Sequence, residues 1–165
     1  MEVSLILLLK KITKGMKIMN FSVNIKRLDE NATVPTYGSA CAAGADLYAC
    51  ESNGVEIAAG ATVLVHTGIA MAIPTGYVGL IYARSGLATK KGLAPANKVG
   101  VIDSDYRGEI MVALHNHGSV AQRIENGERI AQIVFTPYAA AEFAVTEELD
   151  DTVRGAGGFG STGSK

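Results

Sequence analysis

Short apolar segments alternate with polar and turn-forming residues through most of the chain. From Phe21 onward, Gly, Pro, Asn or Asp interrupts the apolar segments about every eight to twelve residues, which is typical of β-sandwiches and barrels. Residues 21–25 alternate apolar and polar side chains, as expected of a strand with one buried face. Further strands are expected at 62–65, 69–73, 77–82, 109–114 and 130–135. The pattern therefore predicts an all-β fold, a distorted β-barrel of jelly-roll type.

Two segments depart from this β pattern. Residues 86–91, Gly-Leu-Ala-Thr-Lys-Lys, are the one stretch expected to form a short helix. Residues 139–149 fit a helix about as well as they fit a last strand over 143–146. The acidic residues 147–151 then lead into a tail that holds five glycines between Arg154 and Gly163.

The first eighteen residues differ in character from the rest of the chain. Their apolar run, Val3 to Leu9, is followed by four lysines. The run is shorter than the roughly 20 residues that span a bilayer, and a secretory signal would place its charges before the apolar stretch. We therefore expect a non-core extension over 1–18, a β-barrel domain over 19–149 and a flexible Gly-rich arm over 150–165.

Composition narrows the classes of partner and compartment. The net charge of −1, from scattered residues of both signs, argues against a nucleic-acid polymer as partner. Cys41 and Cys50 are too few for a disulfide framework, which predicts a reducing, cytoplasmic location and small buried thiols. His115 and His117 share a strand face without a third His or Cys ligand, so they are interpreted as surface residues.

The Gly-rich tail carries groups that suit a nucleotide. Its glycines let backbone amides converge on an anion, Arg154 offers a planar fork for phosphate oxygens, and Ser161 and Thr162 can donate further hydrogen bonds. Phe159 is the one aromatic ring among them and could stack on a base. Composition alone favours a flexible linker instead.

Four further polar groups interrupt the strands, and each also fits an ordinary structural role. Asp46 lies between apolar neighbours, where it would serve equally as a turn or cap residue. Residues 84–86, Arg-Ser-Gly, open the helical turn and form either an anion site or an N-cap. Asp103 follows two apolar strand residues and precedes a turn with Tyr106, so it fits either a general base or a solvated hairpin turn. Gln132 is polar inside an apolar strand.

Taken in order, these groups resemble the five motifs of the trimeric dUTPases. The resemblance runs from about Met19 to Gly163. The segments that carry it are Ala43-Gly-Ala-Asp-Leu-Tyr48, Ala83-Arg-Ser-Gly-Leu87, Gly100-Val-Ile-Asp-Ser-Asp-Tyr-Arg-Gly108, Gly127-Glu-Arg-Ile-Ala-Gln132 and Arg154-Gly-Ala-Gly-Gly-Phe-Gly-Ser-Thr-Gly163.

This resemblance implies a dUTP pyrophosphatase, which hydrolyses dUTP to dUMP and pyrophosphate with Mg²⁺, keeps uracil out of DNA and supplies dUMP for dTMP synthesis. Asp103 corresponds to the general base that activates a water to attack the α-phosphorus. Tyr106 corresponds to the ring that lies under the deoxyribose and leaves no room for a 2′-hydroxyl. Asp46 corresponds to the residue that reaches Mg²⁺ through a coordinated water, an arrangement that suits an ion that keeps several waters.

The remaining binding residues follow from the same resemblance. Asn97 and the hairpin backbone around it, including Val101, correspond to a uracil pocket too tight for the 5-methyl group of thymine. In the arm, Arg154 corresponds to the γ-phosphate contact and Phe159 to the ring stacked on uracil. Phosphate contacts are expected from Arg84, Ser85, Gly86 and Gln132, and from the arm residues Gly160, Ser161 and Thr162. The family is a homotrimer whose sites draw on all three subunits, so the arm is expected to be mobile until the triphosphate binds and then to close over a neighbour's site.

Two alternatives come from other functional classes. A dCTP deaminase shares this fold, but that family has a catalytic Glu on the strand after the hairpin, where this chain has Ala113, and it lacks the Gly-rich tail. A non-catalytic nucleotide-binding module would keep the phosphate motifs without needing Asp103. The sequence favours the pyrophosphatase.

Overall fold

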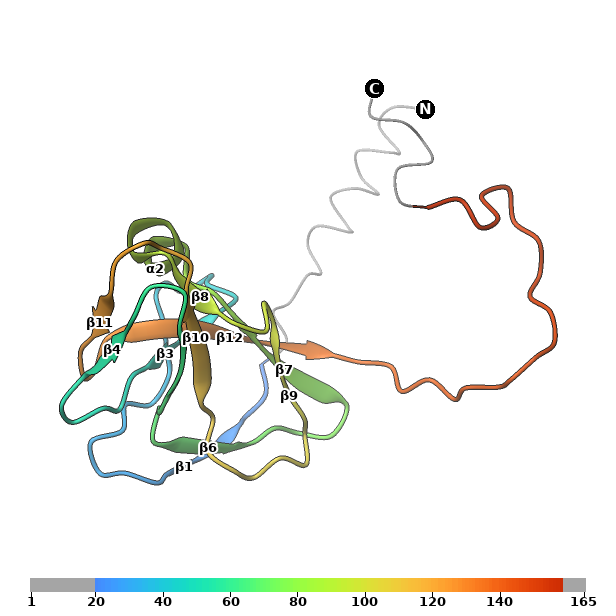
Figure 1. Ribbon diagram of the computed structural model, residues 1–165. Helices are drawn as coiled ribbons and strands as arrows, with labels where there is room; N and C mark the ends of the chain where they lie inside the picture. Colours follow the sequence, from blue (N-terminus) through green and yellow to red (C-terminus); the bar gives the residue numbers. More distant parts are fainter. Residues whose placement is uncertain (1–19, 159–165) are drawn as a thin grey trace, which may run out of the picture.

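The computed structural model describes residues 20–158, which form twelve strands and one short helix (Figure 1). Its elements are β1 (Asn24–Arg27), β2 (Thr36–Tyr37), β3 (Ala45–Tyr48), β4 (Val55–Ile57), β5 (Thr62–Val65), β6 (Ile69–Ala72), β7 (Tyr77–Tyr82), α2 (Ser85–Lys91), β8 (Leu93–Pro95), β9 (Gly100–Ile102), β10 (Val112–Asn116), β11 (Gln122–Ile124) and β12 (Arg129–Pro137).

The largest sheet has five antiparallel strands in the order β2-β3-β12-β7-β9. Three smaller sheets pair β1 with β6, β5 with β10 and β8, and β11 with β4. The described strands stay in these separate sheets and do not close into a continuous barrel. The expectation of an all-β fold with one short helix is confirmed.

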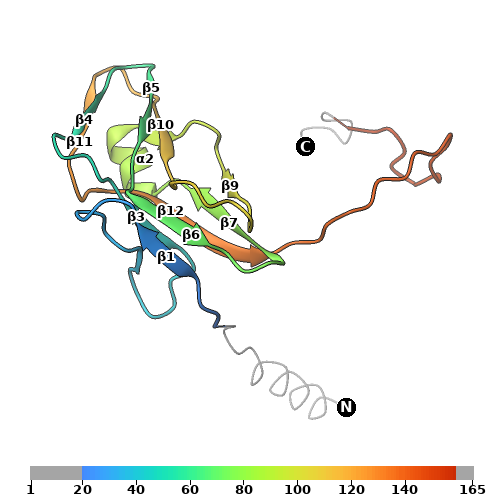
Figure 2. The same cartoon turned by 90° about the horizontal axis from the view of Figure 1, so that it is seen from below.

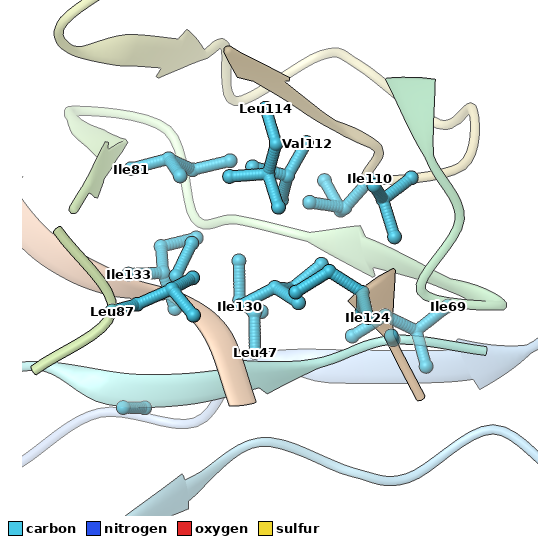
Figure 3. Packing of buried hydrophobic residues seen from close by; sticks show 14 of the residues in the cluster. Leu47, Ile69, Ile81, Leu87, Ile110, Val112, Leu114, Ile124, Ile130 and Ile133 are labelled. Atoms are coloured by element: carbon cyan, nitrogen blue, oxygen red, sulfur yellow. The ribbon is translucent and has the colours of Figure 1, made fainter. Parts of the chain in front are cut away.

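The core lies between the sheets and is built from aliphatic side chains (Figure 3). Strand β10 shows the pattern that produces it, because its alternate residues Val112, Leu114 and Asn116 are buried. The Asn116 side chain is fully buried and satisfied, since its amide donates to Ile57 O at 2.9 Å and to Val120 O at 2.8 Å. The labelled core residues are Leu47, Ile69, Ile81, Leu87, Ile110, Val112, Leu114, Ile124, Ile130 and Ile133.

Several elements lie where the alternation places them, and two begin later. The strands predicted at 62–65 and 77–82 match β5 and β7, and the helix begins one residue early, at Ser85. The first strand begins at Asn24, and Phe21 lies before it and stacks on Tyr77, with ring centroids 4.4 Å apart. Strand β10 begins at Val112, since Glu109 forms only an isolated bridge with Ala70.

Beyond β12 the chain leaves the β body (Figures 1 and 2). Residues 139–149 form neither the helix nor the last strand that were considered, and Phe143 and Val145 are almost fully exposed at 94% and 102%. No strand of the same chain pairs with this segment in the described structure. The last strand ends at Pro137, and the Tyr138 amide still donates to the Gly76 carbonyl at 3.1 Å. The domain boundary expected at residue 149 stays a prediction. The extension predicted over 1–18 lies outside the described residues.

Two smaller expectations concern membranes and thiols. Within residues 20–158, no helix has both the length and the apolar character needed to cross a membrane. Both cysteines are free, but Cys41 is exposed and Cys50 is half-buried, so the expectation of two buried thiols is wrong for Cys41. Cys41 lies in the irregular segment between β2 and β3, where no strand alternation directs its side chain inward.

Candidate active site

Asp46, in β3, is the centre of the first group of predicted site residues. Its side chain is only 11% exposed, and both carboxylate oxygens pair with guanidinium groups. Arg84 Nε donates to Oδ1 at 2.7 Å, and a terminal nitrogen of Arg129 donates to Oδ2 at 3.2 Å. Two guanidiniums beside one carboxylate leave a net positive charge, which suits the oxygens of a phosphate chain.

The start of α2 adds backbone donors to this group. Arg84 is its N-cap, and Ser85 and Gly86 follow, exposed, in the first turn. The first amides of a helix have no partner within the helix. An arginine beside such a helix start matches the anion-binding arrangement predicted for these three residues.

Gln132 joins the same group from the neighbouring strand. It lies in β12, opposite Asp46 on one side and Tyr82 on the other. Its Nε2 donates to the Ala83 carbonyl at 2.9 Å, so the side chain ties β12 to the residue before Arg84. The structure thus brings Asp46, Arg84 and Gln132 together, although the sequence separates them widely.

Arg129 belongs to the same group in space, although its sequence position did not indicate this. The register between β12 and β3 shifts between Arg129 and Ala131, and a β-bulge of this kind re-aims side chains. Simple alternation of polar and apolar residues gives no sign of a bulge. The only available signal was that Arg129 lies inside the Gly127–Gln132 segment.

A second group of predicted residues surrounds a small cleft beside β9. The cleft has a volume of about 90 Å³, and Asn97, Val101 and Ala113 line it. Close packing of Gly100 on β7 shapes its floor, because a Cβ at Gly100 would lie 3.1 Å from the Cβ of Ile81. Drug-sized ligands fill roughly 300–1,000 Å³, so this cleft has room for one small ring, and any attached groups must lie outside it.

Asp103 and Tyr106 lie in the loop that joins β9 to β10. Asp103 directly follows β9, is exposed, and accepts a hydrogen bond from the Tyr106 amide at 3.2 Å through its carbonyl. The Tyr106 ring lies over Gly108, where an added Cβ would come within 2.6 Å of the ring Cζ. An exposed carboxylate beside an exposed ring can contact both a water and a ligand, as a general base requires.

The two groups are far apart within one chain. Asp103 follows Ile102, which pairs with Gly79 near the start of β7, whereas Asp46 lies level with Tyr82 at the end of β7. At about 3.3 Å per residue and about 4.8 Å between strands, they are separated by about 13 Å along the strands and about 14 Å across them. A single chain therefore does not place Asp103 and the Arg84–Asp46 pair at one phosphate.

Arg154, the one predicted substrate-binding residue of the arm among residues 20–158, lies apart from both groups. Arg154 is exposed on the segment that leaves the body (Figure 2), and its Nε donates to the nearby Gly157 carbonyl at 2.8 Å. The other arm residues predicted to bind substrate, Phe159, Gly160, Ser161 and Thr162, lie outside the described residues.

The side chains that could bind a metal ion are the His, Cys, Asp and Glu residues of the described chain. Among residues 20–158 there is no group of three or more His, Cys, Asp or Glu side chains that could hold an ion directly. His115 shares a hydrogen bond with Thr62 Oγ1 at 2.9 Å. Asp46 keeps lone pairs beyond those used by the two arginines, since a carboxylate has about four acceptor sites. The site therefore fits an ion held mainly by its ligand's phosphates and touched by Asp46 through water.

Comparison with known proteins agrees with this geometry. Residues 30–163 match the dUTPase family model. The chain belongs to the dUTPase family. It is 49% identical over 140 residues to a deoxyuridine 5′-triphosphate nucleotidohydrolase of Acinetobacter baumannii, covering 84% of this chain and 93% of that protein. A protein of the same name from Desulfitobacterium hafniense is 51% identical over 138 residues, covering 83% of this chain and 91% of that protein.

Solved dUTPase structures share the fold as well. The dUTPase of Staphylococcus bacteriophage 80alpha, solved with dUPNHPP, aligns with a TM-score of 0.80 and 30% identity, covering 87% of this chain and 99% of that chain. A mutant of the same phage dUTPase, G164S with dUpNHpp, aligns with a TM-score of 0.79 and 28% identity over the same shares. All five motif segments noted in the sequence fall inside the range matched by the dUTPase model.

One ionisable pair in this dUTPase lies close to the β9–β10 loop that carries Asp103. Nothing in the sequence indicated that its two residues pair. His66 Nδ1 is 2.9 Å from Glu109 Oε2. The hydrogen bond to Glu109 raises the pKa of His66 above 6.5. Burial alone would raise the pKa of Glu109, but hydrogen bonds from His66 and the Gly68 amide outweigh it and lower the pKa below 4.5. Both groups are therefore mainly charged between pH 4.5 and pH 6.5, the ordinary pKa values of the two side chains.

The His66–Glu109 pair predicts a pH dependence of stability. The contribution of His66 is complete below its unfolded pKa of 6.5 and is lost as pH rises through its raised folded pKa. The contribution of Glu109 is complete above 4.5 and is lost as pH falls through its lowered folded pKa. Because the His66 side chain is half exposed, we expect a loss below about 1 kcal/mol from about pH 6 to about pH 8.

Urea unfolding of wild type and His66→Asn across this range measures the loss. The free energy of unfolding of His66→Asn should lack this pH-dependent component, and Glu109→Gln should remove the same component. Glu51 also faces His66, since it accepts a hydrogen bond from the His66 amide at 2.9 Å, so Glu51→Gln serves as the comparison for a general charge effect. An unchanged pH slope in His66→Asn would contradict the assignment.

Proposed function

We propose that this chain is a dUTP diphosphatase that hydrolyses dUTP to dUMP and pyrophosphate. The observation that carries the proposal is the exposed carboxylate of Asp103, which directly follows β9 beside a cleft with room for one small ring. Membership of the dUTPase family supplies the substrate that such a site would take. The activity keeps uracil out of DNA and provides dUMP for dTMP synthesis.

In this mechanism Asp103 takes a proton from a water that attacks the α-phosphorus in line with the leaving pyrophosphate. Phosphoryl transfer depends mainly on positioning and charge stabilisation. Asn97 and the backbone around Val101 hold uracil in the cleft, and the Tyr106 ring supports the deoxyribose. The narrowness of the cleft disfavours the methyl group of thymine.

The phosphates bind at the positively charged group on β3, β12 and α2. Arg84 and the amides of Ser85 and Gly86 face the phosphate oxygens, and Gln132 orients the segment before Arg84 through its bond to Ala83. Asp46 would hold Mg²⁺ through a coordinated water, and the ion would supply charge neutralisation at the phosphates. In the arm, Arg154 binds the γ-phosphate and Phe159 stacks on uracil, with Gly160, Ser161 and Thr162 giving further phosphate contacts.

We propose a homotrimer with shared sites, and the distances within one chain support sharing between subunits. Asp103 and the Arg84–Asp46 pair lie too far apart in one chain to act on one phosphate, but different subunits can bring them together. The segment that follows Pro137 and leads into the arm supports the same assembly, because it leaves its own body with almost fully exposed apolar side chains at Phe143, Val145, Leu149 and Val153. Such apolar exposure is a mark of surfaces that contact another chain. We therefore propose that the arm over 150–165 closes on a neighbouring subunit. We also propose that the enzyme is cytoplasmic, as its few cysteines predict.

Substrate specificity gives the test of the proposed function. The protein is incubated with Mg²⁺ and, separately, with dUTP, dTTP, UTP and dCTP, and pyrophosphate and ammonia are measured. We expect pyrophosphate from dUTP at a rate at least about 10²-fold above that from UTP, because rejection of an added group can reach this size in a tight site.

The other nucleotides separate the alternatives. Ammonia released from dCTP would indicate a deaminase, which the presence of Ala113 on β10 argues against. Binding of dUTP without any pyrophosphate release would indicate a nucleotide-binding module. Equal turnover of dUTP and dTTP would contradict the assignment of the cleft as a uracil pocket.

A further inference from the structure

Glu109 binds the turn between β5 and β6 with its whole carboxylate. Oε1 accepts hydrogen bonds from the backbone amides of Gly68 at 2.8 Å and Thr67 at 3.2 Å. Oε2 bonds His66 Nδ1 at 2.9 Å. The side chain is only 21% exposed. A carboxylate that receives several charge-assisted hydrogen bonds is held firmly in one place.

The backbone of Glu109 is also the end point of the loop that carries Asp103. The Tyr106 hydroxyl donates to the Glu109 carbonyl at 3.0 Å, and the Tyr106 amide donates to the Asp103 carbonyl at 3.2 Å. A continuous series of contacts therefore runs from the β5–β6 turn through Glu109 to Tyr106 and on to Asp103.

The rest of the loop has no comparable attachment to the body. In the described structure, every hydrogen bond made by residues 103–108 either stays within the loop or ends at Glu109. The Arg107 guanidinium, for example, donates to the Ser104 carbonyl at 2.7 Å. Strand pairing ends at Ile102. Glu109 is thus the point at which the loop is fastened to the β body on its C-terminal side.

We infer that Glu109 is a positioning residue for the reaction, because its carboxylate fixes the loop that holds Asp103 and Tyr106. The inference rests on the proposed function, in which Asp103 acts as base and Tyr106 supports the sugar. A displacement of about 1 Å at a reacting group can cost about 10²-fold in rate. Loss of the hydrogen bonds made by the Glu109 carboxylate should therefore lower kcat, although Glu109 itself does not contact the substrate.

Glu109→Ala and Glu109→Gln test this inference in the full-length protein. We expect Glu109→Ala to lower kcat for dUTP about 10- to 100-fold, with a smaller change in KM. Glu109→Gln should recover most of this loss, because its amide oxygen can still accept from the Thr67 and Gly68 amides. Glu125→Ala is the matched control, since it removes another carboxylate in an ion pair, with Arg123 at 2.8 Å, at a distance from the hairpin.

A double variant separates positioning from mere stabilisation. If Glu109 acts mainly through Asp103, then adding Glu109→Ala to Asp103→Asn should lower kcat far less than Glu109→Ala lowers it in the wild-type protein, because residues that act as one unit are non-additive. Thermal unfolding of each protein is recorded alongside. If Glu109→Ala does not fold, the same comparison is made with Glu109→Gln, whose remaining loss of kcat should likewise be far smaller in the Asp103→Asn background.

The possible results distinguish the positioning role of Glu109 from the proposed dUTP diphosphatase activity. A folded Glu109→Ala protein with a lower unfolding temperature and unchanged kcat would overturn the positioning role. Fully multiplied losses in the double variant would overturn it as well. Failure of the wild-type protein to release pyrophosphate from dUTP would instead overturn the proposed function. Wild-type turnover together with an inactive Asp103→Asn protein and an unimpaired Glu109→Ala protein would refute the positioning inference alone.

Discussion

Asp103→Asn is expected to lower kcat for dUTP about 10²- to 10⁴-fold, the usual contribution of a general base. The asparagine side chain keeps the size of the carboxylate but cannot take a proton from the attacking water. Asp103 is exposed and its backbone, not its side chain, holds the Tyr106 amide. The fold and the cleft should therefore survive the substitution.

Two measurements distinguish loss of the base from loss of the site. Pyrophosphate release gives kcat, and calorimetric titration with a non-hydrolysable dUTP analogue gives the affinity, which should change little. Asp105→Asn is the matched control, because it makes the same change two residues away on an exposed turn. A nearly unaffected kcat in Asp103→Asn would remove Asp103 from the role of base.

The local pattern of apolar and turn residues was sufficient to predict the limits of some strands and the start of the helix. Residues 62–65 and 77–82 are apolar runs bounded by glycine or other turn residues, and they form β5 and β7 with the expected limits. The arginine at position 84 could be placed at a helix start for the same reason. These predictions depend only on residues a few positions apart in the chain.

Features that depend on distant contacts were not predictable in this way. Arg129 reaches Asp46 only because a bulge shifts the register of β12 on β3. Glu109 reads as one polar residue at the start of an apolar run, yet it binds amides more than forty positions earlier, at Thr67 and Gly68. Tertiary pairing decides both positions, and the alternation of residues does not encode it.

The segment after Pro137 shows a different limit. Residues 143–146 have the composition of a strand, and the sequence left helix and strand open. In the described chain they form neither, because strand formation needs a partner that supplies hydrogen bonds and buries the apolar face. If that partner belongs to another subunit, the sequence of one chain shows that residues 143–146 can form a strand, but it does not show which strand they pair with.

Sharing of sites between subunits predicts that activity is recovered when two inactive variants are mixed. One is the full-length Asp103→Asn variant, which keeps its arm. The other is a chain that ends at Val153, which keeps Asp103 but lacks Arg154 and everything beyond it. Each alone should have little turnover, because every site lacks either the base or the arm.

Mixed trimers should regain turnover if the base and the arm of each site come from different subunits. The base is intact in half of the subunits of an equal mixture and the arm in the other half. About a quarter of the sites should then hold both, provided that subunits combine at random. Pyrophosphate release after joint unfolding and refolding measures this fraction against wild type treated in the same way.

The control mixture combines Asp103→Asn with a chain that carries both Asp103→Asn and the truncation. No site in that mixture has a base, so turnover should stay at the level of Asp103→Asn alone. Full activity of the truncated chain by itself would show that the arm is dispensable. An active wild-type trimer whose two variants never complement would place base and arm in the same subunit, although the exposed arm and the distance from Asp103 to the Arg84–Asp46 pair argue for exchange between chains.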